Sequence, residues 1–277
     1  MAQPVGWALW TRQVRAMIWL ELKKTFLRVR ALPVVFAALL PAALLGLRAI
    51  GMAVTGADPD PAPEMALAYA SIFQLFFVRL VIFFGCFGIF TYLVRGEVAE
   101  RSLHFYLLAP LRREVFLAGK FVAGVLAGWA LFGASLLLQL AFAFLPGATA
   151  GGRAYLLSGP GLGQAAAYGG VTLLAVIGYG ALFLALGLLV KNPMIPAAAL
   201  LGWEWLNFLL PPVLQKISVI HHLQSLCPLP IPRGPFALPA EPTPPILAVP
   251  GVLLLAALLL WIAARRARRL EVAYAAE

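Results

Sequence analysis

Charged residues are scarce in this chain of 277 residues. Asp, Glu, Lys and Arg together make up 12% of it, whereas they make up about a quarter of an ordinary soluble domain. Apolar residues account for 62%, and a single globule of this size has too little interior to bury so much apolar surface. The composition therefore excludes a soluble globular domain and predicts that many side chains face lipid.

Cysteine is rare as well, with two copies in the chain. Cys86 lies inside an apolar run, and Cys227 lies in a Pro-rich loop. Because the two residues are expected at different depths, a disulfide between them is not favoured. We expect two free thiols, and their surroundings do not indicate a metal or redox pair.

Few residues are available to build an enzyme site within a membrane. The topology derived below places His104 on the inner side and His221 and His222 on the outer side, so the histidines do not converge on one metal. Ser71 and Ser135 have no His or Lys at a comparable depth to act as a base. We therefore expect no catalytic, cofactor-binding or metal site on this chain.

Long apolar runs are abundant, and each has about the 20 residues that a helix needs to cross ~30 Å of hydrocarbon. The runs show no alternating barrel pattern, so their backbone groups must be paired within helices. The six expected spans comprise residues 31–50, 71–94, 121–145, 165–190, 194–215 and 246–264. Prolines crowd both ends of the fifth run. The sequence thus predicts an all-α, polytopic transmembrane bundle that forms a single domain over residues 1–277.

The basic residues predict how the bundle is oriented. With both termini in the cytoplasm, sixteen Lys and Arg residues fall on inner segments and four on outer ones. This bias follows the positive-inside rule and indicates a multi-pass protein of a bacterial cytoplasmic (inner) membrane with both termini inside. The acidic, Pro-rich loop around Asp58 and Asp60 suits the outer side. Because the basic residues flank apolar runs and do not form an aromatic-rich patch, we expect no nucleic-acid binding.

Two segments that do not span the membrane are also expected to be helical in part. In residues 5–30 an apolar face with Trp7 and Trp10 lies opposite Arg12 and Arg15, which is typical of an interfacial helix over 1–30. The alternative is a basic flank that is helical by continuity with the first span. The longest outer loop, 216–245, is expected to begin with a short helix that dips toward the membrane and to continue in irregular Pro-rich structure.

The inner segment 95–120 has charged ends around an apolar centre, LHFYLLAPL. Pro110 prevents one helix from running through the segment. Leu103, Leu107 and Leu111 recur at four-residue spacing. A short amphipathic helix here would present apolar side chains to a cytoplasmic partner, or would rest on lipid headgroups.

The same segment resembles the coupling segment of ABC type-2 export permeases. An acidic-basic start is followed by paired leucines, a proline, two arginines, and a Gly-Lys pair that opens the next span. The matching residues are Glu97, Glu100, Arg101, Leu107, Leu108, Pro110, Arg112, Arg113, Gly119 and Lys120. Ser102 and Leu103 stand where the family often has Gly-Thr. The expected layout of six spans, inner termini and an N-terminal interfacial helix is also similar to that family.

The resemblance implies a permease subunit of an ATP-driven exporter. It implies that two permeases pair as a homodimer or heterodimer and that each segment docks in a groove of a separate ATPase subunit, which binds the ATP. The chain itself has no G-x-x-x-x-G-K-[ST] phosphate-binding loop. The alternative is a membrane scaffold or assembly subunit that transports nothing. The sequence leaves the transported compound open.

Polar residues within the expected spans are costly, at about 2.5–3.5 kcal/mol for a charged one. Arg79 lies about 24 Å of helix from Arg95, and Glu204 lies about 18 Å of helix from Asn192. These similar depths predict a possible intramembrane ion pair between Arg79 and Glu204. The alternative is that Arg79 extends to the outer headgroups, while Glu204 is protonated or faces a wet cavity.

Other residues in the spans are candidates either for a substrate path or for helix packing. The candidates for a path are Gln74, Gln139, Trp203, Trp205 and Asn207. Small residues more often let helices approach closely, and we expect that role for Gly124, Gly128, Gly178 and Gly187.

Overall fold

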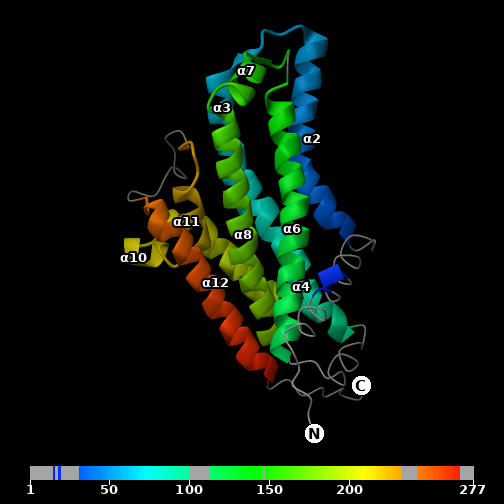
Figure 1. Ribbon diagram of the computed structural model, residues 1–277, viewed down its shortest axis with the longest axis vertical. Helices are drawn as coiled ribbons and strands as arrows, with labels where there is room; N and C mark the ends of the chain where they lie inside the picture. The colour runs from blue at the N-terminus through cyan, green and yellow to red at the C-terminus, as the bar shows by residue number, and fades with distance from the viewer. Residues whose placement is uncertain are drawn as a thin grey trace.

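The computed structural model describes residues 31–99, 113–145, 147–231 and 242–268, together with Arg15, Ile18 and Trp19. Within these residues the chain is an all-α, multi-pass bundle (Figure 1), as the sequence predicted. Its long helices are α2 (Leu32–Thr55), α6 (Arg113–Ala143), α8 (Gly161–Leu189) and α12 (Pro245–Arg268). The expected interfacial helix over 1–30 lies, apart from those three residues, outside the described part of the chain.

The second span is one continuous rod built from three pieces. These are α3 (Ala62–Ser71), the π-helix η2 (Ile72–Ile82) and α4 (Phe83–Ala99). The span begins about three turns earlier than the expected start at residue 71. π-Helical turns are rare and often occur at functional sites, and here they carry Gln74 and Arg79.

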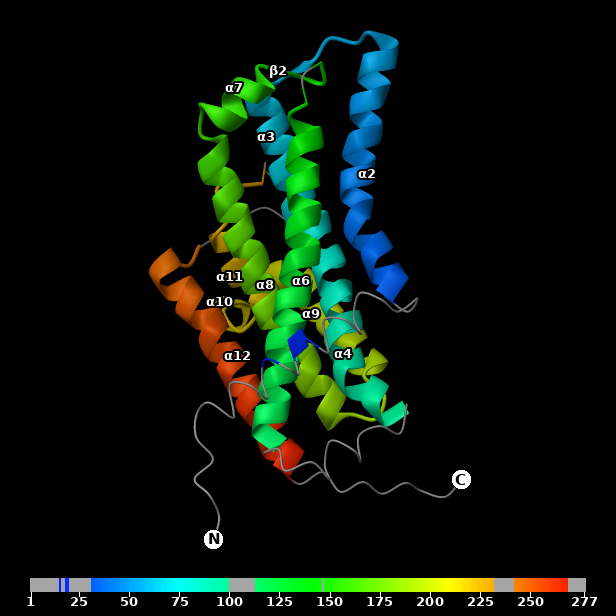
Figure 2. The ribbon, with the colours of Figure 1, turned by 45° about the vertical axis from the view of Figure 1, so that its right-hand side comes forward.

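Helix α8 forms the centre of the bundle. It packs against α4, α6 and α12, and 67% of its most apolar stretch is buried, against 28% for α2 and 22% for α12. Figures 1 and 2 show α2 and α12 on opposite sides of the α6–α8 centre. The exposed faces of these two outer helices are apolar, with side chains such as Leu47 and Leu254, which is suited to contact with lipid.

Glycines bring the central helices into close contact. The Phe90 ring of α4 lies between Gly180 of α8 and Gly124 of α6, where an added Cβ would come within 2.4 Å and 2.6 Å of the ring, respectively. A Cβ on Gly128 would lie 2.9 Å from Val176, and one on Gly178 would lie 3.0 Å from Val219. These contacts confirm the expected packing role. At Gly187 an added Cβ would make ordinary contacts, the nearest at 3.6 Å.

Two loops meet at one end of the bundle. The short strands β1 (Asp60–Pro61) and β2 (Thr149–Ala150) pair in parallel, and α7 (Gly152–Leu157) follows them. Arg48 forms an ion pair with Asp60 and donates a hydrogen bond to the carbonyl of Ala148 (3.3 Å). The acidic loop after the first span and the Gly-rich loop after the third therefore lie on the same side, as expected for two outer loops.

The expected fifth span is wrong as a single helix over 194–215. The helix α9 (Met194–Trp205) has 12 residues, or about 18 Å, too short for a hydrocarbon core of ~30 Å. It is followed by the 3₁₀ turn η3 (Asn207–Leu209), α10 (Pro212–Gln215) and α11 (Val219–Ser225). Proline at positions 211 and 212 has no N–H to continue the helix. In the described residues five helices are long and apolar enough to span a membrane, so the count of six is not confirmed.

The short helix expected in the first half of the 216–245 loop is present as α11. Six of its seven residues are buried, and it packs against α8 and α12. Figure 1 shows α10 and α11 beside the upper part of α12. Residues 232–241, in the Pro-rich half of the loop, lie outside the described residues.

Candidate functional site

Arg79 lies on η2 and is 3% exposed. Its Nη1 atom donates hydrogen bonds to the carbonyl oxygens of Glu204 (3.0 Å) and Trp205 (3.3 Å). These carbonyls lie at the C-terminus of α9, where main-chain oxygens have no partner within the helix. A cation is favoured there because the helix dipole ends in partial negative charge. The guanidinium also lies 5.9 Å from the centroid of the Trp205 ring.

The Glu204 side chain meets a different set of donors. Its carboxylate accepts hydrogen bonds from the Tyr179 hydroxyl (3.1 Å) and from the main-chain N–H groups of Val219 (3.2 Å) and Ile220 (2.9 Å). These two N–H groups open α11, where the helix dipole favours a negative charge. Glu204 is 5% exposed, so its hydrogen bonds form with little competition from water.

We call this group the Glu204 cluster: Arg79, Tyr179, Glu204, Trp205 and the main chain at Val219 and Ile220. It joins η2, α8, α9 and α11 at one place. The structure thus brings Arg79 and Glu204 together, through the main chain of Glu204. The charge pairing of the guanidinium with the carboxylate stays a prediction.

Sequence reasoning missed Tyr179 and the start of α11. Tyr179 is one residue in an apolar run and carries no signal of its own. The beginning of α11 at Ser218 and Val219 is hard to recognise in the sequence, because it directly follows a stretch expected to be a span. Only the break of the chain after Trp205 brings these donors to the Glu204 carboxylate.

Three of the candidates for a substrate path, Gln74, Gln139 and Asn207, form side-chain hydrogen bonds inside the protein. Gln74 donates to the carbonyl of Leu229 (2.8 Å), which ties η2 to the chain after α11. Gln139 donates to Ser135 Oγ (3.0 Å), and Ser135 donates to the carbonyl of Ala38 on α2. Asn207 donates to the carbonyl of Gln215 (3.4 Å). Trp203 is half-buried, as is Trp205.

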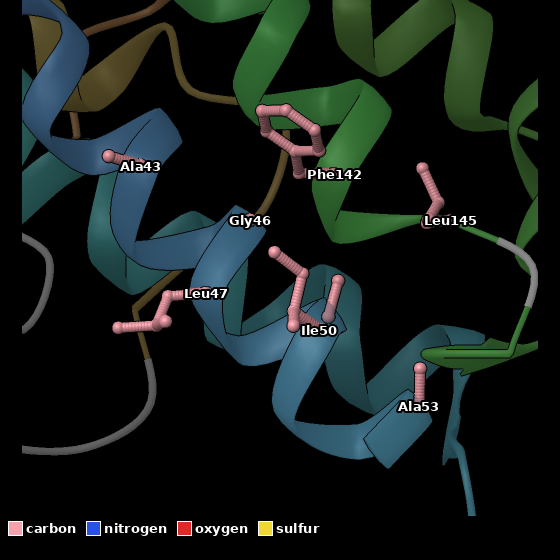
Figure 3. A pocket seen from close by; sticks show the side chains of 8 residues that line it. Ala43, Gly46, Leu47, Ile50, Ala53, Phe142 and Leu145 are labelled. Carbon is pink, nitrogen blue, oxygen red and sulfur yellow. The ribbon is translucent and has the colours of Figure 1, made fainter.

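A pocket of about 420 Å³ lies elsewhere, between α2 and α6. Figure 3 shows Phe142 of α6 and Leu145, two residues after α6, across from Gly46 and Ile50 of α2. All of its lining residues are apolar, namely Ala43, Gly46, Leu47, Ala49, Ile50, Ala53, Phe142 and Leu145. None of the candidates for a substrate path lines it, so it gives them no support.

The histidines of α11 tie that helix to the chain on either side of it. His221 Nε2 is hydrogen-bonded to Thr243 Oγ1 (2.9 Å), and His222 Nε2 donates to the carbonyl of Lys216 (2.8 Å). Both cysteines are free thiols, as expected, with Cys86 buried and Cys227 half-buried. In the part of the chain that the structure describes, no three His, Cys, Asp or Glu residues come together in a way that could hold a metal ion.

The structure places the predicted coupling residues only at the two edges of the segment. Glu97 lies in the last turn of α4, and Arg113 is the first residue of α6. The others lie outside the described residues: Glu100, Arg101, Leu107, Leu108, Pro110 and Arg112. Their role stays a prediction.

Tyr179→Phe tests how much the hydrogen bond from the Tyr179 hydroxyl to Glu204 contributes to stability. The substitution removes the hydroxyl that donates to Glu204 and keeps the ring that packs against Phe83. Side-chain hydrogen bonds within membranes contribute about 0.6 kcal/mol on average and at most about 1.7 kcal/mol. We expect a loss of stability in that range, measured by thermal unfolding in detergent. Tyr168→Phe on the same helix is the matched control, because the buried Tyr168 hydroxyl has no hydrogen-bond partner among the described residues, and equal losses in both variants would contradict a specific role for Tyr179.

No protein-family model matches this chain, and no curated protein matches it. Its function is therefore argued from its own residues.

Proposed function

We propose that this chain is the membrane-spanning permease subunit of an ATP-driven exporter of the ABC type-2 class, coupled to a separate ATPase subunit. The observation that carries the proposal is the segment between the second and third spans. Its acidic-basic start, paired leucines, proline and paired arginines match the coupling motif, from Glu97 to Arg113. In this proposal the segment docks on the ATPase and transmits the ATPase's movement to the two spans that it joins.

The ends of these spans are suited to that role. Arg95, near the end of α4, donates a hydrogen bond to the carbonyl of Val190, the residue that ends α8. Lys120, early in α6, is fully buried, and its Nζ lies 5.0 Å from the centroid of the Phe116 ring. A displacement of the coupling segment would therefore be passed to α4 and α6 directly and to α8 through Arg95.

Features of the sequence support the proposed energy source and the proposed membrane location of the protein. The chain has no phosphate-binding loop of the Walker type, so we propose that the partner ATPase binds the ATP. The excess of basic residues on the proposed inner segments supports a bacterial inner-membrane location with both termini in the cytoplasm. Two permease chains, identical or different, would complete the membrane part.

The proposal predicts that charge reversal in the coupling segment releases the ATPase. We expect Arg112→Glu/Arg113→Glu to reduce co-purification of the ATPase several-fold and to abolish substrate-stimulated ATP hydrolysis, because the docking segment loses its basic end. The matched control, Arg265→Glu/Arg266→Glu, reverses two charges at the end of α12 and should leave both measurements near the wild-type level.

Other outcomes would contradict the proposal in distinct ways. Equal loss of ATPase in the two double variants would show that the segment has no special role. A hydrolase that co-purifies but whose activity never responds to any compound in a panel would favour the scaffold alternative. If no hydrolase is found with the chain in native membranes, the exporter proposal fails altogether.

A further inference from the structure

The segment of residues 194–215, which contains α9, η3 and α10, is poorly packed for an element of a membrane bundle. On α9 the buried residues are Ala197 and Glu204. Met194 and Ile195 at its start are exposed, as are Leu209 and Val213 further along. We call residues 194–215 the α9–α10 segment. Its apolar contacts with the core come from Ala197, Leu200 and Leu201, so apolar burial contributes less here than in the long spans.

The segment is nevertheless one body. Hydrogen bonds join its parts. Where α9 meets η3, the main-chain N–H of Leu206 donates to the carbonyl of Gly202 (2.8 Å), and the side chains of Asn207 and Gln215 donate to the carbonyls of Gln215 (3.4 Å) and Leu210 (2.8 Å), which ties η3 to α10. It is bounded by two short links, residues 190–193 after α8 and residues 216–218 before α11. A rigid piece between two irregular links can rotate as a unit.

The elements on either side are fixed much more firmly. Helix α8 is the most buried span. Helix α11 packs so closely that an added Cβ on Gly178 of α8 would lie 3.0 Å from Val219, and one on Gly251 of α12 would lie 3.0 Å from the His222 ring. The α9–α10 segment thus lies between two fixed helices, and its own attachment determines where it sits.

Apart from the hydrogen bond of His222 to the Lys216 carbonyl in the second link, that attachment is the Glu204 cluster. Arg79 holds the carbonyls at the end of α9, and Tyr179 and the α11 amides hold the Glu204 carboxylate. Hydrogen bonds to charged groups are strong in a surrounding of low dielectric, yet each is directional and is lost after a small displacement. Such hydrogen bonds hold the α9–α10 segment firmly in one position. Once they are broken, they no longer oppose movement of the segment.

We infer that Arg79 and Glu204 form a latch that holds the α9–α10 segment against the second and fourth spans. When the latch is closed, the segment has the position seen here. When it is open, the segment swings between its two links while α8, α11 and α12 stay packed. The latch does not depend on the proposed exporter function, because its parts all belong to this chain.

Distances between spin labels test the latch in the full-length chain, purified in lipid nanodiscs without nucleotide. The labels are placed on exposed residues in a Cys86→Ala/Cys227→Ala background. One pair, Val213→Cys with Leu254→Cys, reports on α10 against α12. A second pair, Leu162→Cys with Leu254→Cys, reports on α8 against α12.

We expect the unaltered latch to give a single narrow distance distribution for both pairs. In Arg79→Gln/Glu204→Gln, which removes both charges and keeps a polar side chain at each position, the α10–α12 distribution should broaden or shift while the α8–α12 distribution stays narrow. Arg79→Lys keeps a cation but not the two-carbonyl geometry, and it should give an intermediate width. Gln139→Leu removes another fully buried polar side chain of the spans and should change neither pair.

Two results would overturn the inference. An α10–α12 distribution that stays narrow in the double variant would show that apolar contacts suffice to hold the segment. Broadening of both pairs would show that the two residues support the whole bundle and not this segment. Neither result bears on ATPase binding, so failure of the latch and failure of the exporter proposal are distinguishable.

Discussion

Glu204→Ala is expected to lower the free energy of unfolding by about 3–5 kcal/mol, the usual cost of removing one partner of a buried charge pair. The substitution leaves the Tyr179 hydroxyl and the N–H groups of Val219 and Ile220 without their acceptor, and it removes the carboxylate that we predict to pair with the Arg79 guanidinium. The measurement is the unfolding equilibrium in mixed micelles, followed by tryptophan fluorescence. Glu64→Ala removes an exposed carboxylate near the start of α3 and should change stability by no more than about 0.5 kcal/mol.

The double variant Arg79→Ala/Glu204→Ala completes a thermodynamic cycle. If the guanidinium and the carboxylate neutralise each other, the loss of unfolding free energy in the double variant should be smaller than the sum of the losses in the two single variants, by about 0.5–3 kcal/mol. Strictly additive losses would refute the ion pair that the matched depths predict. In that case the main-chain contacts alone would account for the proximity of the two residues.

Gly180→Leu is expected to destabilise the bundle by about 3 kcal/mol, the upper end of the usual cost of overpacking a core. A Cβ at this position already lies 2.4 Å from the Phe90 ring. The ring is fully buried, and Gly124 of α6 also lies against it, because an added Cβ there would come within 2.6 Å of the ring. We expect a marked loss of monodisperse protein in size-exclusion chromatography and a lower unfolding midpoint.

Two controls show whether the lack of space is the cause. Gly170→Leu lies on the same helix at a position where an added Cβ meets no atom within 4 Å, and it should be neutral or slightly stabilising because leucine favours helix more than glycine does. Combining Gly180→Leu with Phe90→Ala should recover much of the lost stability. If the combined variant is worse than both single variants, steric conflict with Phe90 is not the cause.

Glycine packing was predictable from the sequence, whereas its partners were not. Small residues in the apolar runs of α6 and α8 indicated close helix approach without specifying which side chain fills the space. Phe90 fills it because α4 crosses both helices at that level. The register between helices is a property of their packed arrangement, and hydropathy carries no information about it.

The fifth apolar run shows the clearest limit of the sequence. Its hydropathy resembles that of a span, because transfer to lipid and burial in a protein favour the same residues. Whether such a run crosses the membrane as one helix depends on whether its broken backbone can be satisfied by other parts of the chain. Here Arg79, 125 residues before Glu204, satisfies carbonyls at the end of α9, and Glu204 satisfies the first amides of α11.

The sequence by itself determined that this protein resides in a membrane as a helical bundle, because few charges and long apolar runs leave lipid as the only suitable solvent. It also predicted that Arg79 and Glu204 lie at similar depth, since a helix advances by a constant rise per residue, and the structure places the Arg79 guanidinium against the Glu204 carbonyl. Only the tertiary structure decided that the fifth run is broken and that Tyr179 and α11 complete the surroundings of Glu204. The reason is that unpaired backbone groups must find partners in space, and those partners lie far away along the chain.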